Sequence, residues 1–144
     1  MNLPILAPAA VLVLWSLIVM LWMVVTRFSA FSKMGVDLSK APPGGRGVNL
    51  DGVAPDKAQW KSHNYNHLME QPTLFYATSL ILALAGAGDL DVKLAWAYVV
   101  LRVLHSLWQS MVNTIPVRFM LFVLSSIALG VMAVRAVMIT MGHA

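Results

Sequence analysis

Long apolar runs separated by polar segments dominate the pattern of this chain. A helix needs about 20 mostly apolar residues to cross the roughly 30 Å hydrocarbon core of a bilayer. Four runs approach or exceed this length, and they cover residues 4–26, about 68–87, about 94–112 and about 117–141. The pattern therefore predicts four transmembrane helices in a single integral membrane domain, residues 1–144.

The first run, residues 4–26, resembles a secretory signal peptide in its position, but its composition favours a retained span. It contains no ionisable residue and no positive residue precedes it. It is also longer than the apolar core of about 7–15 residues that signal peptides have. We therefore expect this run to be the first transmembrane helix.

The connections between the runs predict how the helices are arranged. Residues 27–67 form a long polar loop, with a turn-forming Pro-Pro-Gly-Gly-Arg-Gly stretch at residues 42–47. The other two connections, residues 86–91 and 113–116, are short. Because short links force neighbouring helices to run antiparallel, we expect an all-α, up-down-up-down four-helix bundle.

The composition agrees with a membrane protein and excludes several function classes. Apolar residues make up 59% of the chain and charged residues 11%, whereas a soluble domain has about 45–50% and about 25%. The chain has no cysteine, which excludes disulfides, thiolate metal sites and cysteine nucleophiles. Its ten basic residues are scattered rather than gathered in a stripe, so we expect no nucleic-acid partner.

The distribution of basic residues predicts the orientation in the membrane. Six Lys and Arg residues lie in the loop 27–67, and Arg118 adjoins the third connection, whereas the second connection has only Lys93. By the positive-inside rule, the first and third connections are cytoplasmic and both termini lie on the opposite side. Arg135, within the fourth run, runs against this pattern, and we expect its side chain to snorkel outward.

The third run carries a polar stripe along an otherwise apolar helix. At about 100° per residue, five polar side chains fall within one arc: Arg102, His105, Ser106, Gln109 and Asn113. Ionisable groups inside membrane helices are costly, face a bundle interior or cavity, and mark candidate functional sites. This stripe is therefore the first place to expect chemistry.

A second polar cluster lies at the start of the second run and shares one helical arc: His63, Asn66, His67 and Glu70. Glu70 is the only glutamate of the chain, and we expect it to pair with Arg102 or, failing that, with Arg118. Arg118 opens the fourth run, with Phe122 and Ser125 on the same side. Three helix faces can thus converge on one polar cleft near the cytoplasmic ends.

Each of these clusters also has a purely structural interpretation. A Glu70–Arg102 pair fastens two helices equally well, and His105 and Gln109 can serve as interhelical hydrogen-bonding residues worth about 0.6 kcal/mol each. The spacing His63-x-x-x-His67-x-x-Glu70 resembles a metal-binding pattern. Because the chain has only four histidines, we expect no metal site. A transporter is also disfavoured, since the chain shows no internal repeat.

The order of these motifs resembles the MAPEG family, the membrane-associated proteins in eicosanoid and glutathione metabolism. The resemblance rests on Glu70-Gln-Pro-Thr-Leu-Phe75, then Arg102-x-x-His105-Ser, with Asn113 and Arg118 downstream. It implies a left-handed four-helix bundle assembled as a homotrimer, with glutathione bound between subunits at the cytoplasmic side. It further implies that Arg118 activates the thiol, since a guanidinium stays protonated and lowers the pKa of a nearby thiol.

The resemblance also implies which other residues contact glutathione, and it shows departures from the family pattern. Glu70, Arg102, His105 and Arg27 match family positions. Glutathione-binding members carry Arg-x-x-Arg-Asn-x-x-Glu before the second helix, where this chain has His63-x-x-Asn66-His67-x-x-Glu70. A family tyrosine is replaced by Gln109 and a serine by Phe119.

Two functional hypotheses follow from the resemblance and its departures. The first is an enzyme in a cleft open to the bilayer, conjugating glutathione or another thiol to a lipophilic substrate or reducing peroxides. The second is a non-catalytic MAPEG-like membrane scaffold, serving as a lipid-binding or accessory subunit of a larger complex. The absent arginines favour the second hypothesis, and the retained Arg102, His105, Asn113 and Arg118 favour the first.

Overall fold

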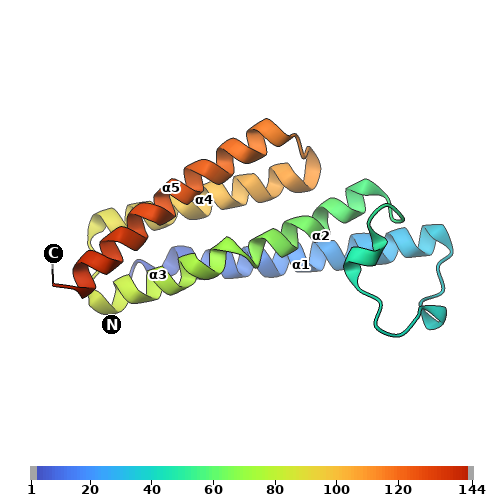
Figure 1. Ribbon diagram of the computed structural model, residues 1–144, viewed down its shortest axis with the longest axis horizontal. Helices are drawn as coiled ribbons and strands as arrows, with labels where there is room; N and C mark the ends of the chain where they lie inside the picture. The colour runs from blue at the N-terminus through green and yellow to red at the C-terminus, as the bar shows by residue number, and fades with distance from the viewer. Residues whose placement is uncertain (1–2, 143–144) are drawn as a thin grey trace.

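The computed structural model describes residues 3–142, which form helices and turns without a strand. Two short 3₁₀ helices, η1 (Leu38–Lys40) and η2 (Gly47–Leu50), lie between the first two of five α-helices. The α-helices are α1 (Leu6–Met34), α2 (Asp56–Leu68), α3 (Gln71–Ala85), α4 (Asp89–Met111) and α5 (Ile115–Thr140). Figure 1 shows α2 and α3 following each other as one bent rod beside α1, and α4 and α5 as an antiparallel hairpin.

The break between α2 and α3 has a local cause in the sequence. Pro72 occupies the first turn of α3, where its missing N–H would have no helical partner in any case. In a continuous helix the ring of Pro72 would clash with the carbonyl of the preceding turn, so α2 cannot continue into α3. Glu70, just before α3, has φ −88° and ψ −99°, outside the helical region. The bend therefore places Glu70 and the end of α2 at an irregular point of the bundle.

The helices reach further into the first connection than the sequence pattern indicated. α1 continues through the polar residues after Thr26 and ends at Gly35, whose φ of 65° is the left-handed conformation of a helix C-cap. All but the last residue of α2, Leu68, lies within the expected loop 27–67. Polar residues at the rim of the bundle are compatible with helix, so α1 and α2 extend into the expected loop. The part of the connection without an α-helix is therefore only residues 35–55.

The core is a seam of apolar side chains shared by the helices, while many other apolar side chains face outward. Fully buried members of the seam include Leu12, Val19, Phe75, Tyr98 and Met132, and the Phe75 and Tyr98 rings stack with their centroids 4.4 Å apart. Large apolar residues cover the outside of α1 and α5. These two helices are long and apolar enough to cross a membrane. α3 has only 15 residues and α4 carries the polar stripe.

Arg135 does not snorkel outward, contrary to the expectation from the sequence. Its Nη2 donates to Oδ2 of Asp91 at 3.1 Å, and its Nε donates to Oδ1 of the same carboxylate. The Gly88 N–H also donates to Asp91, at 2.9 Å. Although Asp91 is fully buried, these donors keep its pKa below the usual range, with the Arg135 hydrogen bond as the main cause. The pair ties the start of α4 to the end of α5.

Candidate functional site

The polar stripe of α4 is the buried face of that helix. Arg102 and Ser106 are fully buried, and His105 and Gln109 are 3% and 6% exposed. Asn113, just beyond α4, is half-buried and has a positive φ of 60°. The interior position that the sequence predicted for the stripe is therefore confirmed for its four helical members.

The guanidinium of Arg102 is held by α2. Its Nη2 donates to the carbonyl oxygen of His67 at 3.2 Å, and its Nη1 lies 3.4 Å from His67 Nε2. The Tyr98 and Phe122 ring centroids lie 6.0 and 5.9 Å from the guanidinium carbon. The Arg102 Nε is buried without a hydrogen-bond partner. This cation is therefore positioned by neutral groups and retains an unused donor.

Glu70 does not form the direct ion pair with Arg102 or Arg118 that the sequence suggested. Its carboxylate lies 3.1 Å from His67 Nδ1, and its side chain is 69% exposed. A carboxylate can only accept, so Nδ1 carries the proton and Nε2 is left free to accept from Arg102. The expected pair is thus a relay in which Glu70 acts on Arg102 through His67.

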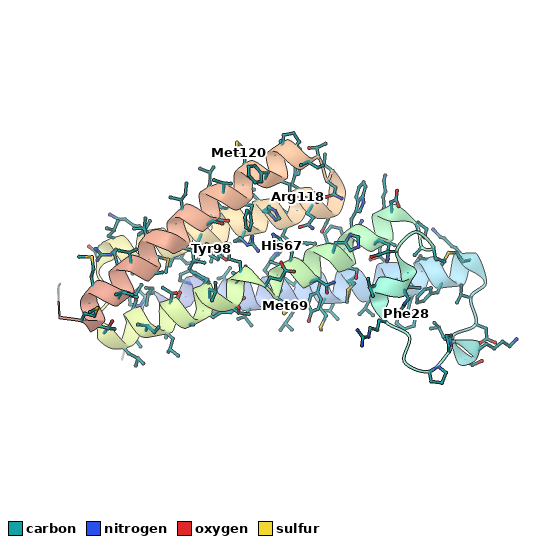
Figure 2. All side chains as sticks on the ribbon, in the orientation of Figure 1. Phe28, His67, Met69, Tyr98, Arg118 and Met120 are labelled. Carbon is teal, nitrogen blue, oxygen red and sulfur yellow. The ribbon has the colours of Figure 1, made fainter. Side chains whose placement is uncertain are left out.

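A small cavity lies where α2, α4 and α5 meet. Its volume is about 170 Å³, and its lining comprises His67, His105, Ile115, Arg118, Phe119 and Phe122. Figure 2 shows His67 and Arg118 on the facing sides of the two halves of the bundle. The His67 and His105 rings lie 4.9 Å apart between centroids. The convergence of three helix faces predicted from the sequence is therefore present.

Arg118 reaches this cavity without a carboxylate partner. Its Nη1 donates to Oδ1 of Asn113 at 2.7 Å, so the two residues flanking the α4–α5 turn fix each other. Among residues 3–142, no carboxylate lies within 4.0 Å of the Arg118 or Arg102 guanidinium. The cavity therefore has one uncompensated positive charge in its wall, Arg118, and a second, Arg102, behind His67, an arrangement suited to an anion.

Of the candidate residues, His67, His105 and Arg118 line this cavity, whereas Arg27, His63 and Asn66 have other surroundings within the same chain. Arg27 donates from Nη2 to Ser62 Oγ at 2.7 Å and lines a different cavity. His63 Nε2 lies 3.1 Å from Asp51 Oδ1, and Asn66 is exposed. Since His63 and His67 contact different carboxylates, the His-x-x-x-His spacing does not form one metal site. Residues 3–142 contain no cluster of His, Asp and Glu that could hold a metal ion.

Comparison with known proteins agrees with this arrangement. The model of the MAPEG family matches residues 5–138, nearly the whole chain. The chain belongs to the MAPEG family. No curated protein and no solved structure matches it. The resemblance carried by Glu70, Arg102, His105 and Arg118 is therefore confirmed at the level of the family, and this MAPEG protein is an integral membrane protein.

The MAPEG protein also has a buried polar network that the sequence pattern did not single out. Asn64 is fully buried, and its Nδ2 donates to Ser106 and Ser110 at 2.7 and 2.9 Å. The indole of Trp15 donates to Ser106 at 2.9 Å. The network therefore joins α1, α2 and α4 beside the stripe. Its signal in the sequence is the four-residue spacing of Ser106 and Ser110, which places both hydroxyls on one face.

Proposed function

We propose that this MAPEG protein is a thiol-dependent enzyme that uses glutathione to conjugate lipophilic electrophiles or to reduce peroxides. The observation that carries the proposal is the Arg118 guanidinium, which lines the cavity and has no carboxylate partner among residues 3–142. Arg102 lies behind it, bonded to His67, which also lines the cavity. Structural ionisable groups in a membrane interior pair with one another or with backbone carbonyls, as Arg135 does with Asp91 and Arg102 does with the His67 carbonyl. Among residues 3–142, Arg118 has neither kind of partner. Arginines without such partners are available for an anionic ligand.

The donors at this cavity fit glutathione in chemistry, and a single chain supplies only part of the space. When bound, glutathione supplies two carboxylates and a thiol. The free donors of Arg118, which lines the cavity, suit carboxylate and thiolate groups. The volume of about 170 Å³ is below the roughly 300 Å³ at which ligand pockets begin. A neighbouring subunit would have to complete the site.

Each side chain has a defined task in the proposed reaction. Arg118 would hold a positive charge near the sulfur, which favours loss of the thiol proton to water and stabilises the thiolate. The thiolate would displace halide from an aryl halide. With a hydroperoxide it would break the O–O bond and release the alcohol, and a second glutathione would then form the disulfide and water. Glu70 orients His67, and His67 fixes the Arg102 guanidinium. Phe119 and Phe122 give the cavity an apolar wall, and Phe119 is 65% exposed. A lipophilic substrate could therefore enter from the bilayer past Phe119.

A non-catalytic membrane scaffold is the second candidate function. It is favoured by the positions of His63, Asn66 and His67, which stand where glutathione-binding relatives have the Arg-x-x-Arg-Asn pattern. His63 is engaged with Asp51. Arg27, His63 and Asn66 could reach the thiol only from another subunit. The scaffold hypothesis predicts no thiol binding at all.

Glutathione binding by the purified protein in detergent distinguishes the two candidates. We expect calorimetry to detect binding, and we expect an aryl halide or a lipid hydroperoxide to be consumed in a glutathione-dependent reaction. The matched control is Arg118→Leu, which should lose the activity. Absence of both binding and turnover in the wild-type protein would support the scaffold.

A homotrimer is the assembly that we propose for this site. One chain leaves the cavity incomplete and the Glu70 carboxylate 69% exposed. Crosslinking in native membranes should therefore trap species up to three subunits and no further. A strictly monomeric protein in mild detergent would contradict the trimer.

The proposed sidedness places the connection 35–55 in the cytoplasm. In intact cells, Gly45→Cys should resist a membrane-impermeant thiol reagent, whereas Asp89→Cys, at the first residue of α4, should react. Both positions are exposed, and the natural chain has no cysteine, so the labelling is unambiguous. Permeabilised cells give the control, in which both variants react. The reverse pattern in intact cells would invert the orientation.

A further inference from the structure

A second and larger cavity lies between the end of α1 and the connection 35–55. Its volume is about 580 Å³, within the range of about 300–1,000 Å³ typical of ligand sites. Two arginines and several apolar side chains line it, among them Arg27, Phe31, Leu38, Pro42, Arg46 and Leu50. The cavity combines a cationic part with an apolar part.

The charges at this cavity are uncompensated. None of its lining residues is acidic, and among the described residues no carboxylate lies within 4.0 Å of the Arg27 or Arg46 guanidinium. Arg27 uses one donor for Ser62, and its Nε is buried without a partner. An arginine has five N–H donors in a planar fork, so Arg27 keeps donors for a ligand.

The backbone of η2 lies close to the Arg27 guanidinium. A Cβ at Gly47 would lie 3.0 Å from Arg27 Nη2 and 3.1 Å from Nη1. A side chain at residue 47 would therefore require the guanidinium to shift by a few tenths of an ångström. Ser62 fixes the other side through its hydrogen bond. The guanidinium is therefore oriented before any ligand binds, which lowers the entropic cost of binding.

The position of the cavity indicates the source of its ligand. Arg27 follows directly on the apolar run 4–26, so it lies where that run meets the lipid headgroups. Val25 and Phe28 are 67% and 59% exposed on the same helix, and Figure 2 shows Phe28 near the loop end of α1. The opening therefore borders the bilayer surface, where phosphate groups are abundant.

We propose that this cavity binds the phosphate group of an anionic phospholipid. Arginine forks recognise phosphate oxygens in pairs, and basic pockets beside transmembrane helices bind lipid headgroups. Phe31, Leu38 and Leu50 would contact the glycerol and upper acyl carbons. The resemblance implies that Arg27 contacts glutathione, and the proposal instead assigns Arg27 to a site that shares no lining residue with the cavity of Arg118. It would anchor the connection 35–55 to the membrane surface.

The test compares lipid binding by matched charge variants. The wild-type protein, in nanodiscs of phosphatidylcholine with or without phosphatidylglycerol, should melt at a higher temperature with phosphatidylglycerol, because a ligand that binds only the folded state stabilises it. Arg46→Gln, an exposed position, should weaken retention of phosphatidylglycerol in native mass spectrometry about tenfold, the loss of roughly one charged hydrogen bond. Arg27→Gln should have at least the same effect. The matched control is Lys33→Gln, which removes one exposed positive charge from α1 outside the cavity.

The outcomes separate a specific site from general surface charge. Retention lost in both arginine variants and kept in Lys33→Gln supports the site. Equal losses in all three variants, or no preference for phosphatidylglycerol over phosphatidylcholine, overturn it. Inorganic phosphate is the second probe: if it stabilises the wild-type protein as strongly as phosphatidylglycerol does, the site takes soluble phosphates and the lipid assignment is wrong. Melting without phosphatidylglycerol reports whether each variant is folded.

Discussion

Replacing Arg118 by leucine should abolish thiol-dependent activity while leaving the protein folded. Within the described part of the chain, the guanidinium has one side-chain hydrogen bond, to Asn113, and no carboxylate partner. If its task is to stabilise a thiolate, its removal should lower turnover on the order of 10²-fold, as for other groups that stabilise developing negative charge. The loss of stability should stay within about 1.5 kcal/mol, the net value of one such hydrogen bond.

Two further variants make this result specific. Arg118→Lys keeps the charge but not the fork, so it should retain part of the activity. Arg102→Leu should lower the melting temperature more than Arg118→Leu, because Arg102 is fully buried and holds the His67 carbonyl. Equal melting losses for the two leucine variants, with no stabilisation of the wild-type protein by glutathione, would make Arg118 part of the scaffold.

The pH dependence of the reaction rate distinguishes a chemical role of Arg118 from a structural one, because a purely structural role would not change it. A free thiol has a pKa of about 8.5, and a positive charge beside it lowers that value. The wild-type rate should therefore reach its plateau at a lower pH than the residual rate of Arg118→Leu, which should keep rising through about pH 8.5. Superimposable profiles would show that Arg118 does not act on the thiol.

The sequence predicted the buried stripe of α4 because only one face of that helix is polar. Periodicity is informative in that case, and Arg102, His105 and Gln109 are inside as expected. α2 is polar on several faces, so periodicity could not tell which face packs inward. Asn64 is fully buried, whereas Asn66 is exposed. The choice depends on which α2 side chain meets Ser106 and Ser110, a tertiary contact.

The pairing of Glu70 could not be read from composition alone. A lone glutamate near two arginines suggests a direct ion pair, yet the bend before Pro72 turns Glu70 outward and gives the inner position to His67. The sequence also contains a signal for a different ion pair, the one between Asp91 and Arg135, which the hydrophobic pattern did not reveal. Asp91 and Arg135 are equally far along the chain from Asn113, at the α4–α5 turn. In an antiparallel hairpin this symmetry brings the two residues side by side.

Removing Arg135 should destabilise the protein more than removing Asp91. Arg135→Leu leaves the fully buried Asp91 carboxylate without its ion-pair partner, and an uncompensated buried charge costs about 3–5 kcal/mol. Asp91→Asn leaves Arg135, whose side chain is 33% exposed, able to reach water. In Asp91→Asn the Gly88 N–H donates to a neutral amide oxygen instead of a carboxylate. A hydrogen bond to a charged group contributes about 1.5–3 kcal/mol, and part of this contribution is lost. Thermal melting of the purified protein in detergent measures both losses.

The double variant and the pH dependence identify the pair as the cause. Asp91→Asn combined with Arg135→Leu should recover much of the loss of Arg135→Leu, since no buried charge then remains. Because the folded-state pKa of Asp91 is depressed, mainly by Arg135, its contribution is present above the unfolded value of about 3.9 and is lost as the pH falls through the lower folded value. The melting temperature of the wild-type protein should therefore fall more steeply below about pH 4 than that of Asp91→Asn. Parallel curves, or strictly additive losses in the double variant, would show that the ion pair does not hold α4 and α5 together.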